Sequence, residues 1–471
     1  MSNTDIVISL ITKLLAERDT FTSDDIRPLL PADISPRAIP PALGKARRDG
    51  LVEEVDRVKS MIPERKGSLV PVLRRPGSVL GAAVSAESHS QGSTEVKESL
   101  SGLASEIREL QHFLNVTGYV CGIEEIATYL LLLASHNWVI LSGPSGTGKS
   151  SLVKRVASAL DAQFHDVQVK PNWVSSEDSL GYYSEATSTF LPGPVADALT
   201  EASENPESMH FVRFDEMNLA SPEYYLAEIL SAGESWSVDE DGISRSDRVQ
   251  LPPMPQGAPR PTVHITGNTF LIGTVNVDET TRSLSAKVLD RSAVLDLRHV
   301  DLFSISSQAV GDQIVSQPTL DAVRDMLAHR PRSISSAGPS QEEVDLVAEV
   351  LDNLRGPSEV LSGPIGYRQR DALVKMLTIA KRTQLTDVLP PDSVIDIGLR
   401  SCVLPKWQGS TPAARRALTD ALAVLLDRDV NRDQNNDSLR SFGAASRFPR
   451  TVEKIVDMAD QFDSLGYFSA W

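Results

Sequence analysis

The stretch Trp138-Val139-Ile140-Leu141-Ser142-Gly143-Pro144-Ser145-Gly146-Thr147-Gly148-Lys149-Ser150-Ser151 decides the fold of this chain. It begins as an apolar run rich in β-branched residues and continues as Gly-x-x-x-x-Gly-Lys-Ser. Apolar residues then recur at helical spacing: Leu152, Val153, Val156, Ala157 and Leu160. The order of strand, glycine loop and helix is the context that a P-loop requires.

The chemistry of phosphate binding explains the residue types in this stretch. Glycines leave backbone N–H groups free to close around phosphate oxygens, and the helix N-terminus adds partial positive charge. A lysine at position 149 reaches the β- and γ-phosphates, and the hydroxyl of Ser150 is offered to Mg²⁺. We therefore predict a nucleoside-triphosphate site formed by Gly143, Pro144, Ser145, Gly146, Thr147, Gly148, Lys149, Ser150 and Ser151.

Composition narrows the class of protein. A chain of 471 residues has room for roughly three domains. Its net charge of −17 argues against a protein that coats nucleic acid. Two distant cysteines, Cys121 and Cys402, are expected to be packing residues in a reducing cytoplasm. The longest apolar run, 129–134, is too short to cross a bilayer, so we expect a soluble, cytoplasmic protein that makes no membrane contact.

The N-terminal part, 1–75, is predicted to be a small α+β domain like a winged helix. Three helical segments precede two strand-like segments, 51–55 and 69–73. Residues 37–75 hold 10 Lys/Arg against 5 Asp/Glu, so any DNA contact is expected there, through Arg37, Lys45, Arg47, Arg48 and Lys66. Recruitment of a protein partner is the equal alternative. A serine-rich linker is expected over 76–104, a nucleotide-binding domain over 105–300, and a helical lid and C-terminal region over 301–471.

A second strand, 164–169, is followed by a loop rich in aromatics, glycine and proline. This loop suits a substrate-facing segment, although core packing explains Trp173 and Tyr182 equally well. A further strand then delivers Asp215 and Glu216 at its carboxyl end. We expect Asp215 to hold Mg²⁺ together with Ser150, and Glu216 to polarise the attacking water.

A third apolar strand, from Phe270 onward, ends in Asn276, which we expect beside the γ-phosphate, orienting that water. A helix over 283–289 then leads to Asp290 and Arg291. Arg291 is placed to reach the phosphate of a neighbouring subunit as an arginine finger. The alternative for Arg291 is a surface salt bridge with Asp290 or Asp296.

The P-loop, the Asp215–Glu216 pair, Asn276 and Arg291, in this order along the chain, resemble the motifs of AAA+ ATPases. The match extends to the McrB-like branch, the motor subunits of McrBC-type restriction systems. The resemblance covers about residues 110–471. It is carried by the following segments: Asp215-Glu216-Met217-Asn218-Leu219-Ala220, Gly273-Thr274-Val275-Asn276-Val277-Asp278-Glu279-Thr280-Thr281, Leu284-Ser285-Ala286-Lys287-Val288-Leu289-Asp290-Arg291, Gly366-Tyr367-Arg368 and Leu404-Pro405-Lys406-Trp407-Gln408-Gly409-Ser410.

The resemblance implies an α/β AAA+ P-loop core with a helical lid, assembled as a hexameric ring. It implies that Arg291 acts in trans and that Arg368 is the lid arginine that senses nucleotide, with Arg370 as the weaker candidate. McrB hydrolyses GTP and has Asn-Thr-Ala-Asp where this chain has Asn276-Val277-Asp278-Glu279, so ATP is favoured here while GTP stays open. The N-terminal part does not resemble the modified-cytosine reader of McrB.

Three functions follow as hypotheses. The leading one is the motor of a restriction or phage-defence complex that acts on DNA with a separate McrC-like nuclease subunit. The second is a remodeller of protein complexes like the MoxR and midasin relatives, in which the winged helix recruits protein. The third is a DNA-bound regulator whose nucleotide only sets assembly, and the complete set Asp215, Glu216, Asn276 and Arg291 argues against it.

Overall fold

The computed structural model describes residues 102–240, 242–277, 283–298, 317–430 and 436–470. It also describes 20–22, 52–59, 69–74 and the single positions Ile11, Ile26 and Leu43. The chain divides into two compact units, Met1–Glu95 and Val96–Trp471.

The described strands of the first unit form one antiparallel sheet. Its order is β1 (Thr20–Thr22), β3 (Leu69–Arg74), β2 (Glu53–Lys59). The pairing of β2 with β3 confirms the predicted hairpin, but β2 begins two residues later than expected and contains a register shift between Glu54 and Asp56. Strand β1 falls within the part that was expected to hold only helical segments, before the two strand-like segments. The candidate DNA-contacting residues Arg37, Lys45, Arg47, Arg48 and Lys66 lie outside the described residues.

The second unit is built on a five-stranded parallel sheet with the order β12-β4-β11-β8-β5. These strands span Ala293–Asp296, Trp138–Gly143, Thr269–Asn276, His210–Asp215 and Gln163–Gln168, in that order. The inner strands β4, β11 and β8 are buried almost throughout, which explains their unbroken apolar runs. The edge strand β5 is half polar because one side faces solvent.

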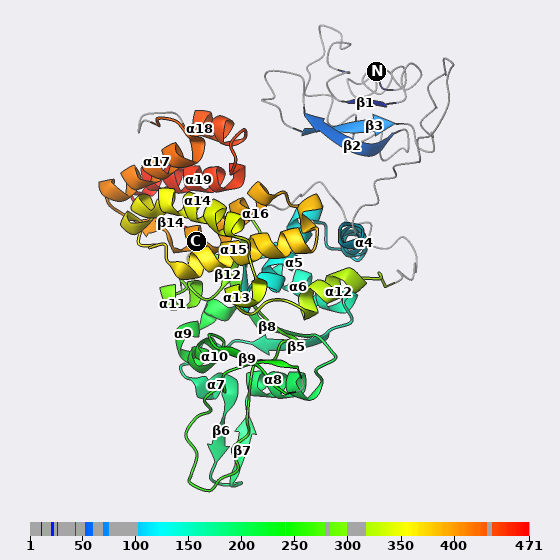
Figure 1. The fold of residues 1–471 in the computed structure, drawn as a ribbon, viewed down its shortest axis with the longest axis vertical. Helices are drawn as coiled ribbons and strands as arrows, with labels where there is room; N and C mark the ends of the chain where they lie inside the picture. Colours follow the sequence, from blue (N-terminus) through cyan, green and yellow to red (C-terminus); the bar gives the residue numbers. More distant parts are fainter. Residues whose placement is uncertain are drawn as a thin grey trace, which may run out of the picture. The chain divides into compact units, whose positions relative to one another are not determined.

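Helices and two small hairpins surround this sheet (Figure 1). The helices up to the last sheet strand are α4 (Gly102–Val116), α5 (Ile123–Ser135), α6 (Lys149–Ala159), α7 (Ser176–Leu180), α8 (Pro194–Glu204), α9 (Pro222–Tyr225), α10 (Ala227–Ala232) and α11 (Ala286–Leu289). The hairpins are β6 (Gly181–Ser184) with β7 (Thr189–Pro192), and β9 (Trp236–Val238) with β10 (Ser244–Ser246). Helix α4 begins at Gly102, inside the stretch expected to be linker.

The C-terminal region is helical over its described residues, as predicted. Its elements are α12 (Asp321–Ala328), α13 (Ile334–Ala337), α14 (Gln341–Val360), α15 (Tyr367–Arg382), α16 (Pro391–Gly398), the π-helix η6 (Leu399–Val403), η7 (Leu404–Lys406), α17 (Pro412–Leu426), α18 (Asn436–Gly443) and α19 (Pro449–Leu465), with the short strands β13 (Gln408–Gly409) and β14 (Phe468–Ser469). One hydrophobic cluster runs from α4 and α5 through α14, α15 and α19, so this region packs on the sheet unit as part of a common core.

The predicted α/β P-loop core with a helical C-terminal region is therefore confirmed. Among the described residues, none of the helices combines the length and the apolar character that a membrane span requires. Cys121 and Cys402 are both buried and unpaired, as expected for packing residues.

Candidate nucleotide site

The phosphate loop joins β4 to α6, as the sequence predicts. Gly148 immediately precedes α6 with φ 86°, and a Cβ there would lie 2.8 Å from the Tyr119 ring. Gly143 has φ 154°, and its Cβ would lie 2.7 Å from the carbonyl oxygen of Leu297. Both positions thus need glycine for two reasons, a left-handed or unusual backbone and a close neighbour.

Lys149 is the first residue of α6, and its ammonium is turned back onto backbone oxygens of the loop. Its Nζ donates to the carbonyl of Gly143 at 2.9 Å and to that of Pro144 at 2.7 Å. Burial lowers the pKa of Lys149, and the nearby carboxylates of Glu216 and Asp215 act in the opposite direction. Carbonyls are weak partners for a cation compared with phosphate oxygens, so the ammonium is available to a phosphate that enters the loop.

Asp215 and Ser150, the predicted metal ligands, are in direct contact. The Ser150 hydroxyl donates to Oδ1 of Asp215 at 2.7 Å, and the Thr274 hydroxyl donates to the same oxygen at 3.0 Å. Mg²⁺ prefers oxygen ligands and keeps several waters, so one hydroxyl and one carboxylate beside the phosphate loop suit it. Ser150 and Asp215 would hold this ion, which neutralises charge that develops on the phosphates.

Glu216 and Asn276 also meet. Glu216 has φ 50° and ψ 50°, and this left-handed turn directs its carboxylate out of the strand, into solvent beside the loop. Oε1 of Glu216 accepts a hydrogen bond from the Asn276 amide at 2.8 Å. The Asn276 amide thus orients the exposed Glu216 carboxylate, which can accept a proton from a water that attacks a phosphate in the loop.

Three residues that sequence reasoning missed support this site. The Glu216 N–H donates to the Thr274 hydroxyl at 2.9 Å, so Thr274 links the Asp215 carboxylate to the backbone of Glu216. Arg213 donates to Asp166 at 2.9 Å and to the carbonyl of Ser150 at 2.9 Å, and it lies 3.7 Å from Asp215. Asn218 donates to the carbonyl of Asn276 at 3.2 Å. Thr274 and Asn218 lie in segments that carry the resemblance, but local spacing does not reveal these contacts, because each acts across strands that are distant in the chain.

Arg291 and Arg368 lie together, away from this loop. Glu234 is ion-paired with both arginines, and its distance to Nη2 of Arg368 is 3.0 Å. These residues line one cavity with Trp138, the first residue of β4, whereas the loop follows Gly143, the last. Five residue steps of strand separate the two ends by about 16 Å. Neither of the sequence-proposed partners binds Arg291: Lys406 pairs with Asp290 and Lys454 with Asp296.

Some expected elements differ in detail. The helix before Arg291 is one turn, α11, and begins at Ala286 rather than at 283, because Ser285 has extended backbone dihedrals. Trp173 is buried against the edge of Tyr225, with ring centroids 5.2 Å apart, so it is a core residue. Tyr182 is 52% exposed on the β6–β7 hairpin.

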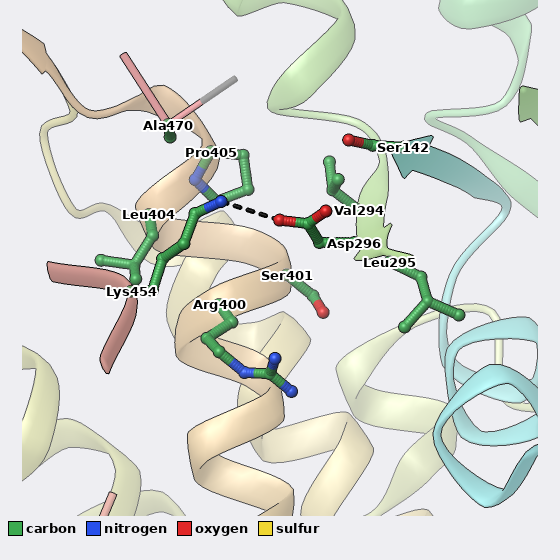
Figure 2. A pocket seen from close by; sticks show the side chains of 10 residues that line it. All are labelled: Ser142, Val294, Leu295, Asp296, Arg400, Ser401, Leu404, Pro405, Lys454 and Ala470. Atoms are coloured by element: carbon green, nitrogen blue, oxygen red, sulfur yellow. Dashed lines mark hydrogen bonds and ion pairs between the residues drawn. The ribbon is translucent and has the colours of Figure 1, made fainter. Parts of the chain in front are cut away.

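The C-terminal region also contacts the end of the sheet from which the phosphate loop starts. Figure 2 shows Lys454 of α19 directed at Asp296, with Nζ 2.7 Å from Oδ2, in a small cavity lined also by Ser142 and Arg400. The residue after Asp296, Leu297, donates its N–H to the carbonyl of Ser142 at 2.7 Å, directly before the loop. A movement of α19 would therefore be transmitted to the first residues of the loop.

A His/Glu cluster at the other end of the sheet does not have the geometry of a metal centre. Nε2 of His165 lies 3.0 Å from Nδ1 of His210, and the ring centroids are 5.3 Å apart at an interplanar angle of 12°. That centroid distance equals the N···N distance plus one ring radius on each side, so the two nitrogens point straight at each other. This is an N–H···N hydrogen bond, whereas two metal ligands converge on the ion at an angle. Burial lowers the pKa of both imidazoles, which favours the neutral pair.

We expect Glu216→Gln to keep nucleotide binding and to lose turnover by about 10²–10⁴-fold, because the amide cannot take the proton of the attacking water. Lys149→Ala should lose binding instead. Phosphate release and binding of a fluorescent nucleotide separate the two effects. The matched control is Glu204→Gln, an exposed carboxylate at the end of α8. Normal hydrolysis by Glu216→Gln would remove this residue from the role of base.

Thr274→Val should lower kcat by about 10–100-fold with nucleotide affinity nearly unchanged, since Asp215 loses a donor and the Glu216 N–H loses its acceptor. Thr269→Val in the same strand is the control, because its hydroxyl bonds Thr266 rather than a carboxylate. Steady-state kinetics test this prediction. Equal kcat values for the two variants would mean that Thr274 is a packing residue.

Comparison with known proteins agrees with this geometry. Residues 138–292 match the AAA domain (dynein-related subfamily), and residues 326–467 match a domain of unknown function, DUF8727. The chain is 31% identical over 122 residues to the uncharacterized protein YojN of Bacillus subtilis (strain 168). The matched stretch covers 24% of this chain and 38% of that protein. It is 30% identical over 92 residues to the uncharacterized protein SAB1265c of Staphylococcus aureus (strain bovine RF122 / ET3-1), covering 18% and 32%.

The chain thus spans about a third of the length of the curated relatives that it matches. A solved structure described as a candidate ATPase of Cytophaga hutchinsonii ATCC 33406 superposes with a TM-score of 0.43 at 18% identity, over 64% of this chain and 87% of that chain. The P-loop, the Asp215–Glu216 pair and the family match agree on one class of domain. Residues 138–292 of this chain form an AAA+ nucleoside-triphosphate hydrolase domain.

Proposed function

We propose that this chain is the motor subunit of a ring in which nucleotide is hydrolysed between neighbouring copies, serving a McrBC-like restriction or phage-defence complex. One observation carries the ring: Arg291 and Arg368 lie at the opposite end of β4 from Lys149 of the same chain. They reach a phosphate only if that phosphate is held by a second copy. Arg368, expected from the resemblance to sense nucleotide, would act beside Arg291.

The other parts of the proposal rest on the sequence resemblance to the McrB-like branch. They are a hexameric ring, a separate McrC-like nuclease subunit that cuts DNA, and ATP with Mg²⁺ as the fuel, with GTP open. DNA would be contacted through residues 37–75, where basic residues exceed acidic ones two to one. A cytoplasmic location is proposed separately, from the two distant cysteines, which suit a reducing compartment.

A second function, remodelling of protein complexes, is favoured by the charge of the projecting hairpin. The segment 171–193, which contains β6 and β7, holds three carboxylates and no Lys or Arg. It exposes apolar side chains instead: Val174 (74%), Tyr182 (52%) and Leu191 (38%). Figure 1 shows this hairpin extending beyond the sheet. A loop that grips a phosphate backbone needs cations, whereas an apolar, acidic loop suits protein.

Mixing two inactive variants tests the shared site. Arg291→Ala should lower turnover by about 10³–10⁵-fold, and Lys149→Ala should abolish it. Equimolar mixing should restore part of the activity, because an intact phosphate loop of one variant meets an intact Arg291 of the other. A mixture of Lys149→Ala with Lys149→Met is the control that cannot recover. No recovery in the first mixture would remove the trans role of Arg291.

The salt dependence of duplex DNA binding separates the two functions. If four N-terminal cations neutralise phosphates, the logarithm of the binding constant should fall with the logarithm of salt concentration at a slope of roughly −4. Replacing Arg47 and Arg48 with acidic residues should make that slope less negative. Affinity purification with a non-hydrolysable nucleotide then identifies the partner. Absence of salt-sensitive DNA binding, together with a non-nuclease partner, would favour the remodeller.

A further inference from the structure

A cavity of about 440 Å³ lies beside the turn that follows α11 and carries Arg291. Its wall comes from distant parts of the chain: the start of β4, the end of α10, the end of α11, the segment before α13 and one face of α15. The charged side chains among its lining residues are Glu234, Asp290, Arg291, Arg332, Arg368, Asp371 and Lys375.

The carboxylates of this cavity already have cationic partners. Glu234 is shared by Arg291 and Arg368. Asp290 is bound by Lys406 at 2.9 Å, and Asp371 by Arg370 at 2.7 Å. Neither Arg332 nor Lys375 has a carboxylate within ion-pair distance among the described residues.

The two inner cations have different surroundings. Arg332 donates to Oδ1 of Asn137 at 3.0 Å and to the carbonyl of Gly267, and it lies over the Trp236 ring at 4.2 Å. These neutral acceptors orient the guanidinium but do not compensate its positive charge. The Lys375 ammonium makes no hydrogen bond or ion pair within the described chain. Burial and the neighbouring Arg332 and Arg330 lower the pKa of Lys375 to about 8, and Cys402 and Asp371 act in the opposite direction.

Arg330 adds a further buried charge directly behind this wall. It is 6% exposed, and it is held by the carbonyls of Leu133 and Thr269. Among the described residues, these three cations have no carboxylate at ion-pair distance, although like charges at short range in a partly buried site repel one another strongly. A multivalent anion in the cavity would turn this repulsion into attraction.

We propose that this cavity binds a phosphate-bearing anion, held from inside by Lys375 and Arg332 and from the more exposed side by Arg291 and Arg368. Guanidinium groups match phosphate oxygens in pairs, and the lysine adds a compact charge. The anion is either a free polyphosphate or nucleotide, or the phosphate chain of a nucleotide bound by a neighbouring copy. The second source rests on the proposed ring.

Tripolyphosphate is the first probe, titrated calorimetrically into the full chain carrying Lys149→Ala, so that the phosphate loop is silenced. One tripolyphosphate should bind per subunit, and adding Lys375→Met should weaken binding at least about tenfold. Lys170→Met in the same background removes an exposed lysine and should leave binding unchanged. Far-ultraviolet circular dichroism and the Tm without anion confirm that each variant is folded.

Assembly tests the second source. If the silenced subunit does not bind tripolyphosphate, Lys375→Met in the otherwise natural chain should raise the nucleotide concentration needed for assembly about tenfold, measured by sedimentation, while nucleotide affinity of the monomer is unchanged. The proposal is overturned if Lys375→Met equals its parent in both measurements. A natural chain that never assembles would refute the ring alone, and the tripolyphosphate titration would still decide the cavity.

The pH dependence gives an independent readout. Lys375 attracts an anion only while it is protonated. Binding should therefore weaken as pH rises from 7 to 9, through the lowered pKa of this group. Lys375→Arg should keep binding at pH 9. Equal losses for lysine and arginine would assign the pH effect to another group that faces the cavity. The other titratable groups that line the cavity are His136, Glu234, Asp290, Arg291, Arg332, Arg368, Asp371 and Cys402, and Arg330 lies directly behind its wall.

Discussion

The Asp215 carboxylate is the junction on which the nucleotide site depends. It lies at the carboxyl end of β8 and accepts hydrogen bonds from Ser150, in the first turn of α6, and from Thr274, on β11. Arg213, two residues earlier in the same strand, holds the carbonyl of Ser150. One strand therefore fixes both the start of the phosphate-loop helix and the neighbouring strand that carries Asn276. The register of the parallel sheet, with Gly273 opposite Phe214, brings these groups to one edge.

Local chemistry explains which parts of this site could be predicted from the sequence. The phosphate loop is contiguous, so its glycines and Lys149 reveal it directly, and Asp215, Glu216 and Asn276 each follow an apolar strand. Parallel strands end at the same edge of a sheet, which places these residues together once the strands are recognised. Thr274 and Arg213 were missed because one is an ordinary strand threonine and the other a cation inside an apolar run. Glu234, the partner of Arg291, lies far away in sequence, and no spacing rule connects them.

The C-terminal region braces both ends of β4. At the phosphate-loop end, Lys454 on α19 pairs with Asp296, beside the residues that contact Ser142 and Gly143 (Figure 2). At the other end, Lys406 pairs with Asp290, which immediately precedes Arg291. The intervening π-helix, Leu399–Val403, packs against β12, and such irregular turns are frequent at functional sites. A rigid C-terminal region would thus move the phosphate loop and Arg291 together.

These contacts hold Arg291 at a fixed distance from Lys149 of the same chain. The half-buried Arg291 is bonded to the Lys287 carbonyl and to Glu234, so a side-chain rotation cannot carry it along the length of a strand to its own loop. If Arg291 takes part in hydrolysis, the phosphate must come from a second copy. Nucleotide bound in that copy would then pull on Arg291 and, through Asp290 and Lys406, on the C-terminal region of this one. The same region also holds Asp296 through Lys454, and the adjacent Leu297 donates its N–H to the carbonyl of Ser142, just before the phosphate loop of this chain. The state of one site would thus reach the following site through two ion pairs joined by the C-terminal region.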